Sequence, residues 1–432
     1  MRPLLPKVRV TNSNFRKAAA NVRSQVQRLP RKEALVRRII SDVRKRGDRA
    51  VLDYTRRFDG ANLRTDQLRI SRGEIAKAQE RVDQQVLSAL RFSLQRLEIL
   101  QGELLSKATF SSELNGFHMQ LALKPLPSVG CYVPGGRAIY PSTILMTAGL
   151  AKLAGVPRVV LCTPPDSTGT VNDAILAAAS LCKVDEVYRC GGAQAIAALA
   201  YGTDTIHRVE KVVGPGGIFV ALAKKVVSGD VAIDFFAGPT ELIVIADEKT
   251  NPRLAAWDLV AQAEHGADCL SGLVTCSEDV VEGIRSEIEQ ILTQIERRKY
   301  VESSFVRGFS ALCDGWDEAC GFVNQVAPEH VELLTENARI LSEKIQNAGL
   351  ILIGPFAPAA ATDYCVGSDH VLPTGGFAKS HAGLSSLDFV RQTWTIEGSS
   401  EGLESVLQPL KALTTAEGLL NHYRSVESRF TK

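Results

Sequence analysis

DEVYRCGGAQAIAALAYG, residues 185–202, passes from a short apolar run through two glycines into an alanine-rich helical segment. VEKVVGPGGIFVALAKKVV, residues 209–227, repeats the pattern. Further β-branched runs that alternate with helical stretches are VPRVVLCTPP (156–165), ELIVIADE (241–248), LSGLVTCS (270–277) and GLILIG (349–354). Alternation of this kind is typical of parallel sheets joined by crossover helices. We therefore predict an α/β fold with at least two parallel sheets, preceded by helices over residues 14–107 and followed by a largely helical tail after about residue 385.

Length and charge limit the class of protein. The chain has 432 residues, which is too long for one compact core, so two or more domains are expected. Its 50 basic and 48 acidic residues give a net charge of +2, which does not favour nucleic acid or an anionic membrane as a partner. The sequence contains no apolar run of membrane-spanning length and no signal-like start. A cytoplasmic location is the expectation.

The cysteines carry little functional information. There are nine, an odd number, and no two form a CxxC pair. This pattern argues against a disulfide scaffold and against a cysteine-based zinc site. We expect small, buried, reduced thiols.

Glycine-rich turns are the first candidate binding features. CGGAQAI (190–196) and VGPGGIF (213–219) each lead from a strand into a helix, where free N–H groups can hold a phosphate. Ordinary turn chemistry explains them equally well, and neither matches GxGxxG. In a third segment, SVGCYVPGGRAIYPST (128–143), Tyr132 could pack on a flat ring or fill the core.

Histidines beside carboxylates are the second candidate feature. In AQAEHG (261–266), Gln262 and His265 are three residues apart, which places them on one face of a helix. In VAPEHVE (326–332), Glu329 and His330 could serve two separate proton transfers, although a helix starting after Pro328 explains the pair as well.

Nitrogen and oxygen donors of the kind zinc prefers are also present. They are Gln262, His265, Asp363 and His422. Their wide spacing along the chain does not by itself assign a metal site.

Taken together, several stretches closely resemble the histidinol dehydrogenase family. The resemblance extends from DVRKRGDRAVLDYTRRFDG (42–60) to the C-terminal helix. The other supporting stretches are SVGCYVPGGRAIYPSTILM (128–146), CGGAQAIAALAYGT (190–203), AIDFFAGPTELIVIADE (232–248), AQAEHG (261–266), APEH (327–330), GSDHVLPTGG (367–376) and AEGLLNH (416–422). Each stretch is weak alone, but their order and spacing together are specific.

The resemblance implies an NAD-dependent, four-electron oxidation of L-histidinol to L-histidine through L-histidinal, with one zinc ion per site holding the substrate. It implies His330 as the base for the alcohol and Glu329 as the base for the water that hydrates the aldehyde. The implied zinc ligands are Gln262, His265, Asp363 and His422. The implied substrate contacts are Thr240, Gln262, His265, His330, Asp363, Glu417 and His422.

The implied NAD contacts are Tyr132, Gln194 and Gly217. Gly217 stands where the family usually has asparagine, so a hydrogen bond to the cofactor is lost. Thr240 replaces a serine but keeps the hydroxyl, and Asp369 replaces an asparagine and adds a charge near the pocket. Rival interpretations are a relative that oxidises another small alcohol, such as a sulfonated diol, and a paralogue that binds ligand or zinc without turnover.

By resemblance, the fold has two incomplete Rossmann-like domains, one inserted in the other, in an intertwined homodimer. The expected division is an N-terminal arm (1–27), a metal and substrate domain (28–129 and 241–384), an NAD domain (130–240) and a helical dimerisation tail (385–432). The tail carries apolar residues at near-helical spacing, which need a partner surface, and Pro409 splits it into two helices. A tail folded back on its own chain is the alternative.

Overall fold

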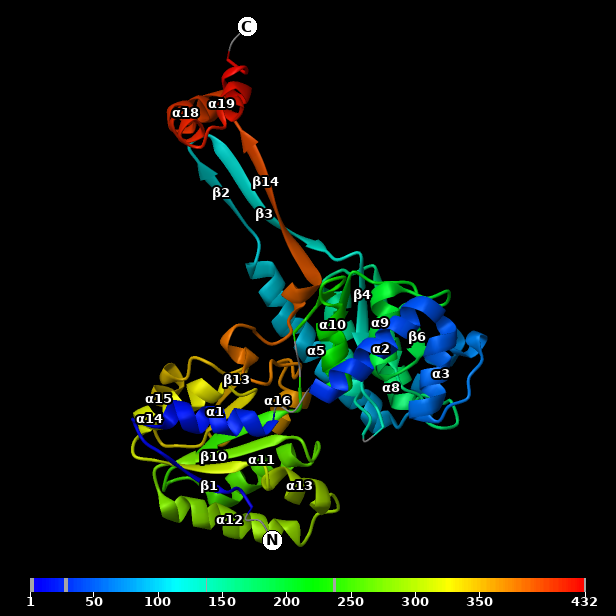
Figure 1. The fold of residues 1–432 in the computed structure, drawn as a ribbon, viewed down its shortest axis with the longest axis vertical. Coiled ribbons are helices and arrows are strands. Elements are labelled where there is room, and N and C mark those ends of the chain that lie inside the picture. Colours follow the sequence, from blue (N-terminus) through cyan, green and yellow to red (C-terminus); the bar gives the residue numbers. More distant parts are fainter. Residues whose placement is uncertain (1–3, 27–29, 137, 236–237, 431–432) are drawn as a thin grey trace.

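The computed structural model describes residues 4–26, 30–136, 138–235 and 238–430. Two parallel sheets form the body of the molecule, as the alternation of strands and helices predicted (Figure 1). One sheet has six strands in the order β1-β11-β10-β9-β12-β13, and the other has five in the order β6-β5-β4-β7-β8. The strands of the larger sheet are β1 (Lys7–Val10), β9 (Glu241–Ile245), β10 (Leu270–Thr275), β11 (Phe309–Cys313), β12 (His330–Leu333) and β13 (Leu350–Ile353). Those of the smaller sheet are β4 (Ser128–Tyr132), β5 (Arg158–Thr163), β6 (Glu186–Arg189), β7 (Lys211–Val213) and β8 (Ala232–Ile233).

Helices cover both sheets. Around the six-stranded sheet they are α1 (Phe15–Val26), α11 (Pro252–Ala263), α12 (Glu278–Leu292), α13 (Arg298–Phe305), α14 (Trp316–Val326), α15 (Ala338–Lys344) and α16 (Ala359–Tyr364). Around the five-stranded sheet they are α2 (Pro30–Arg46), α3 (Asp48–Asp59), α4 (Arg72–Arg81), α5 (Gln84–Lys107), α6 (Pro141–Ile144), a π-helical turn (Leu145–Gly149), α7 (Leu150–Leu153), α8 (Asp173–Leu181), α9 (Gly192–Tyr201) and α10 (Ile218–Val227). Short 3-10 turns occur at Thr65–Gln67, Phe377–Lys379 and Ser386–Phe389.

Local sequence explains where the crossover helices begin. The Asn172 side chain accepts a hydrogen bond from the second residue of α8, and Asn251 does the same for α11, where Pro252 is the first helical residue. Helix α9 consists largely of alanine and is buried over residues 193–200, so it lies close against the sheet.

The domain boundaries differ from the expected ones. Helices α2 to α5 were expected with the metal and substrate domain, but α2 packs on α9 and α10, while α4 and α5 pack on α8. The expected boundary between residues 129 and 130 falls within strand β4, the centre of the five-stranded sheet. The N-terminal arm instead joins the six-stranded sheet, because β1 pairs with β11 and α1 packs on α14.

A long antiparallel ribbon projects from the two sheets (Figure 1). It consists of β2 (Phe110–Leu114), β3 (Phe117–Pro125) and β14 (Val390–Gly398), in the order β14-β3-β2. The prediction of a helical tail from residue 385 is therefore wrong for its first part. The ribbon carries α17 (Ser400–Ser405), α18 (Leu407–Ala416) and α19 (Leu420–Glu427) at its far end. Pro409 lies in the first turn of α18, where proline is tolerated.

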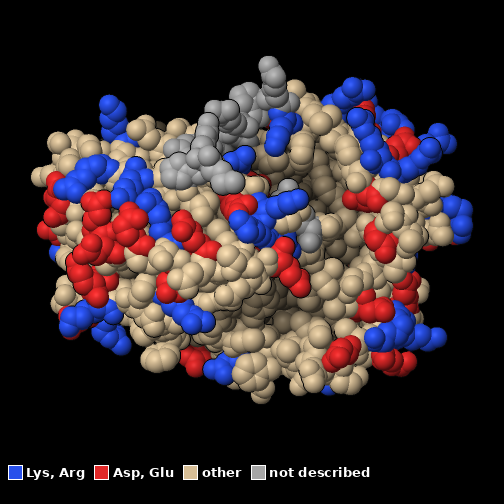
Figure 2. Space-filling model, turned by 90° about the horizontal axis from the view of Figure 1, so that it is seen from below, with Lys and Arg blue, Asp and Glu red and all other residues tan. Residues whose placement is uncertain are grey.

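The burial of the cysteines and the mixture of charges on the surface agree with what the sequence predicted. Seven of the nine cysteines are buried, Cys276 is half-buried and Cys365 is exposed. On the face drawn in Figure 2, basic and acidic side chains lie interspersed. In the described part of the chain, no helix is both long enough and apolar enough to cross a membrane.

Candidate active site

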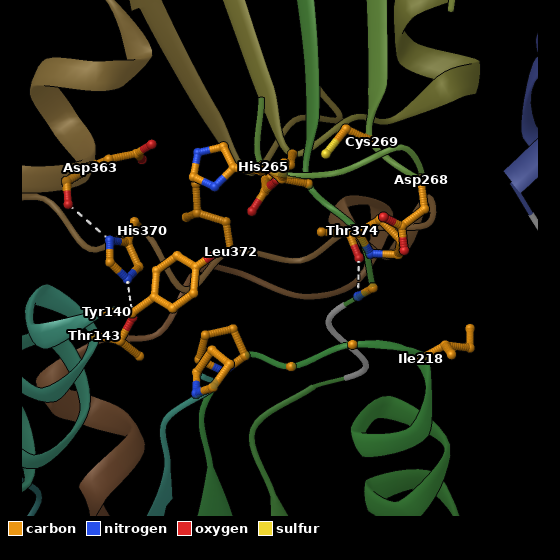
Figure 3. Close-up of a pocket in the computed structure, with 18 of the residues that line it drawn as sticks. Tyr140, Thr143, Ile218, His265, Asp268, Cys269, Asp363, His370, Leu372 and Thr374 are labelled. Atoms are coloured by element: carbon orange, nitrogen blue, oxygen red, sulfur yellow. Dashed lines mark hydrogen bonds between the residues drawn. The ribbon is translucent and has the colours of Figure 1, made fainter. Parts of the chain in front are cut away.

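A cavity of about 470 Å³ lies between the two sheets (Figure 3). Its upper wall in Figure 3 comes from segments just before β9, β10 and β12, at the amino ends of these strands. Its lower wall comes from segments just after β4 and β7, at the carboxyl ends of those strands. The cavity therefore joins one edge of each sheet.

The lower wall is a topological switch point. The chain runs from β4 outward through β5 to β6 and then returns to the other side of β4 as β7. In open α/β sheets, ligands bind in the crevice outside the carboxyl ends of the strands at such a point. Pro134 and Gly135, after β4, and residues 215–219, after β7, line the cavity there.

The residues expected to contact NAD differ in their position relative to this cavity. Gly217 lines the cavity. Tyr132 is buried, and its hydroxyl accepts a hydrogen bond from the Gly192 N–H at 3.1 Å. Gln194 is only 1% exposed, and neither its amide oxygen nor its amide nitrogen has a hydrogen-bond partner among the described residues. An unsatisfied buried amide is costly, so Gln194 is suited to a ligand that would supply the missing partners.

The turn after β7 requires glycine at its first position. Gly214 has φ +117°, and a Cβ atom there would lie 2.2 Å from the Tyr132 carbonyl oxygen. Glycine at this position therefore lets the turn lie close against the backbone of β4, which ordinary turn chemistry explains.

Glu329 and His330 stand at the amino end of β12. The alternative that a helix starts after Pro328 is wrong, because His330 begins a strand within the six-stranded sheet. The Glu329 carboxylate accepts hydrogen bonds from the Thr240 hydroxyl and, at 2.8 Å, from the Glu241 N–H. His330 Nδ1 donates to the Glu241 carbonyl oxygen at 3.2 Å. Glu241, the first residue of β9, thus holds both side chains, and Thr240 before it holds Glu329 as well.

Burial and neighbouring charges shift the pKa values of Glu329 and His330. Burial raises the pKa of Glu329 to about 7, against the opposing effects of His330 and Thr240. Burial disfavours the charged form of His330, but the nearby Glu329 and Asp363 carboxylates outweigh it and raise the His330 pKa to about 9.

Two of the expected zinc ligands line the upper wall, and a third is hydrogen-bonded to Thr240 of that wall. His265 and Asp363 both line the cavity, and burial lowers the pKa of His265, which favours the neutral imidazole that binds metals. Helix α11 ends at Ala263, so His265 lies in the turn that follows rather than on the helix predicted to carry it. Gln262 is buried in the last turn of α11 and donates to the Thr240 hydroxyl.

Asp363 has a free oxygen. Its Oδ1 is buried and lies 3.6 Å from His330 Nε2, beyond hydrogen-bond length, and neither atom has another partner among the described residues. Burial opposes the ionised form of Asp363, but the neighbouring histidines lower its pKa, so it remains a carboxylate. In the described residues, no group of three or more His, Cys, Asp or Glu side chains could hold a metal by itself. A metal ion at this wall would therefore need a further donor.

Glu417 and His422 do not reach this cavity within the same chain. Glu417 caps the C-terminus of α18 and His422 lies in α19, at the far end of the ribbon from both sheets, and both are exposed (Figure 1). The alternative of a tail folded back on its own site is therefore wrong.

Other residues that line the cavity were given no role from the sequence, although His370 is one of four histidines near carboxylates that hint at a site. His370 bridges two walls, because its Nε2 lies 2.9 Å from the Thr143 hydroxyl and its Nδ1 2.8 Å from the Asp363 carbonyl oxygen (Figure 3). Tyr140 and Thr374 also line the cavity. His370 and Thr374 belong to GSDHVLPTGG, one of the stretches that carry the family resemblance. The spacing of residues along the chain did not indicate that this stretch lies beside Asp363.

Comparison with known proteins assigns the family. Residues 22–430 match the histidinol dehydrogenase family. The chain belongs to the histidinol dehydrogenase family. It is 43% identical to histidinol dehydrogenase of Methanothermobacter thermautotrophicus over 392 residues, 90% of this chain and 92% of that one. It is 42% identical to the Gluconobacter oxydans enzyme over 403 residues, which cover 92% of each chain.

A solved structure agrees with the fold. The crystal structure of histidinol dehydrogenase from Elizabethkingia anophelis superposes with a TM-score of 0.92 at 32% identity, covering 99% of this chain and 98% of that one. The protein is accordingly an oxidoreductase of the histidinol dehydrogenase family.

Two departures from the family pattern can now be placed. Gly217 has φ −62° and ψ 176°, an extended conformation open to any residue, and a Cβ atom there would meet no described atom within 4 Å. Asp369 is buried, which raises the pKa of its carboxyl group well above the ordinary value. Burial therefore disfavours the charged form of Asp369.

Proposed function

We propose that this chain oxidises L-histidinol to L-histidine through L-histidinal, using two NAD and one zinc ion per site. The observation that carries the proposal is one cavity that joins His265, Asp363, Glu329 and His330 to the switch-point crevice of the five-stranded sheet. Family membership supports histidinol as the substrate. The net reaction consumes one alcohol, one water and two NAD, and it yields one carboxylate, two NADH and three protons.

Gln262, His265, Asp363 and the tail residue His422 would hold the metal. Zinc, when bound, would hold the substrate by its imidazole and amino groups. The residues present fit such an ion, because Asp363 offers a buried oxygen without a hydrogen-bond partner and His265 is neutral. The oxygen of the Gln262 amide is also left available, since its nitrogen makes the bond to Thr240.

Tyr132, Gln194 and Gly217 would contact the dinucleotide. NAD, when bound in the crevice, would accept one hydride in each oxidation. Gln194 supports this assignment through its unsatisfied buried amide, and Gly217 through its place on the cavity wall beside the first turn of α10.

His330 would take the proton of the alcohol in the first oxidation. A base must be unprotonated, whereas the carboxylates around His330 raise its pKa to about 9. A cation bound at Asp363 would oppose this shift, because it neutralises one of the two carboxylates and disfavours a second positive charge nearby. The base function of His330 would therefore depend on a filled metal site.

Glu329 would take a proton from the water that hydrates the aldehyde. Its pKa of about 7 suits a general base that works near neutral pH. Hydrogen bonds from Thr240 and from the Glu241 N–H hold one carboxylate oxygen and leave the other for water.

A homodimer would complete the site. The ribbon and tail expose large apolar side chains far from the rest of the chain, namely Phe110, Leu114, Trp394, Ile396, Leu413, Leu419 and Leu420. Such a surface is suited to a partner subunit. Domain exchange of this kind would bring Glu417 and His422 of one chain to the cavity of the other.

A spectroscopic assay tests the function. Purified protein should reduce NAD when given L-histidinol, and a chelator should abolish the activity until zinc is restored. His265→Asn should lose most bound zinc and histidinol affinity while it keeps the melting temperature within a few degrees. Full zinc occupancy in that variant, or unchanged activity after complete zinc removal, would refute the metal assignment.

Gly217→Asn should improve NAD binding. The extended backbone and open surroundings of Gly217 accept a side chain, and the asparagine amide would restore a hydrogen bond worth about 0.5–1.5 kcal/mol. The Michaelis constant for NAD should therefore fall by roughly twofold to tenfold. The new side chain would also cap α10, so a matched Gly217→Ser variant, which caps but is shorter, separates helix stability from cofactor contact. An unchanged or higher constant in Gly217→Asn contradicts the assignment.

A further inference from the structure

Arg23 is a nearly buried cation in the last turns of α1, outside the cavity. Its side chain is 12% exposed and forms an ion pair with Glu241, which is 1% exposed. Nε donates to the Val326 carbonyl oxygen at 2.6 Å, and Nη2 donates to the Ala327 carbonyl oxygen at 2.8 Å and to Glu241 Oε2 at 3.0 Å. The planar guanidinium therefore binds a helix end and a carboxylate at once.

The two carbonyl groups belong to the turn that leads into Glu329. Helix α14 ends at Val326, and Ala327 adopts φ +49°, a left-handed conformation that is uncommon for a residue with a side chain. The last carbonyl groups of a helix lack hydrogen-bond donors within the helix. Arg23 donates to two such groups here. Only Pro328 separates this turn from Glu329.

Glu241, the ion-pair partner of Arg23, forms backbone hydrogen bonds with both proposed bases. Its N–H donates to the Glu329 carboxylate, and its carbonyl oxygen accepts from His330. Its side chain also accepts from the Gly375 N–H at 3.0 Å, next to Thr374 of the cavity wall. Arg23 thus holds both segments that determine where Glu329 and His330 point.

We propose that Arg23 of the N-terminal arm is a positioning residue for the Glu329–His330 pair, acting through Glu241 and through the turn at Val326 and Ala327. The inference rests on the proposed function, because it assumes that this pair performs the proton transfers. The sequence marks Arg23 only as a basic residue near the end of a helix. Its partners are more than 200 positions away.

Arg23→Lys is the sharpest test, because lysine keeps the charge but cannot bind two carbonyl groups and a carboxylate in one plane. We expect kcat for histidinal oxidation to fall by about tenfold to a hundredfold, since small misplacement of a catalytic group has effects of this size. The KM for histidinol and the zinc content per chain should stay within about twofold of wild type, because no metal ligand is touched. Arg16→Gln is the matched control: Arg16 is exposed on the same helix, and its substitution should change none of these three quantities.

A second variant guards against loss of folding. In Arg23→Leu/Glu241→Met both charges are removed, so no buried charge is left unpaired, and the chain should fold while its kcat falls as in Arg23→Lys. If both variants keep wild-type kcat per zinc-loaded site and lose only thermal stability, Arg23 is a structural residue and the inference is wrong. Failure of the proposed function is distinct, because wild-type protein itself would then neither bind zinc nor oxidise histidinal.

Discussion

Glu329→Gln should stop the enzyme after its first oxidation. Glutamine keeps the size of the side chain and can still accept hydrogen bonds from Thr240 and the Glu241 N–H, but it cannot take a proton from water. General-base catalysis typically contributes about 10²–10⁴-fold, so the oxidation of supplied histidinal should fall by about that factor. Oxidation of histidinol to the aldehyde level should continue, because His330 is intact.

Single-turnover measurements with each substrate separate the two steps. Wild-type histidinal oxidation should rise with pH through about 7, since the base works only when Glu329 is deprotonated and its pKa is raised to about 7. Glu329→Gln should lack this dependence. His330→Gln is the reciprocal control, with the larger loss in histidinol oxidation. Wild-type rates of histidinal oxidation in Glu329→Gln would show that another group activates the water.

The parallel sheets were predictable because their strands are buried on both faces. Such strands read as continuous apolar runs, as in ELIVIADE and VPRVVLCTPP, and they alternate with helices. The ribbon was missed for the opposite reason. All five residues of β2 are exposed, and β14 is mostly exposed, so no core-facing period distinguishes them from a polar loop or helix.

The assignment of helices to sheets could not be predicted from local pattern. Helices α2 to α5 have the amphipathic pattern of ordinary surface helices. That pattern does not indicate which of the two sheets they cover. The structure pairs α2 with α9 and α10, whose residues lie far along the chain. Likewise, Glu329 and His330 were found by their family motif, whereas Arg23 and Glu241 act through contacts that only the fold creates.

Each active site should contain residues of two chains. His422 is expected to bind zinc together with Gln262 and His265, yet it lies at the tip of the ribbon, away from the cavity of its own chain (Figure 1). A His265→Asn chain and a His422→Ala chain should each form inactive homodimers, because every site lacks one ligand. If tails are exchanged, a mixed dimer contains one site with both substitutions and one site with none.

Mixing the two inactive variants should therefore restore activity. Subunit exchange, promoted by mild denaturant and followed by its removal with zinc present, should return about a quarter of wild-type activity when the chains pair at random. Mixing either variant with a chain that carries both substitutions is the matched control and should restore nothing, because every mixed dimer then lacks an intact site. Zinc content should rise in parallel with activity, which distinguishes a rebuilt metal site from refolding alone. Absence of recovery, once mass spectrometry has shown that mixed dimers form, would mean that the tail completes no site in its partner. The exposed apolar face of the ribbon would then need a different occupant, and the fourth ligand would have to come from a residue nearer the cavity.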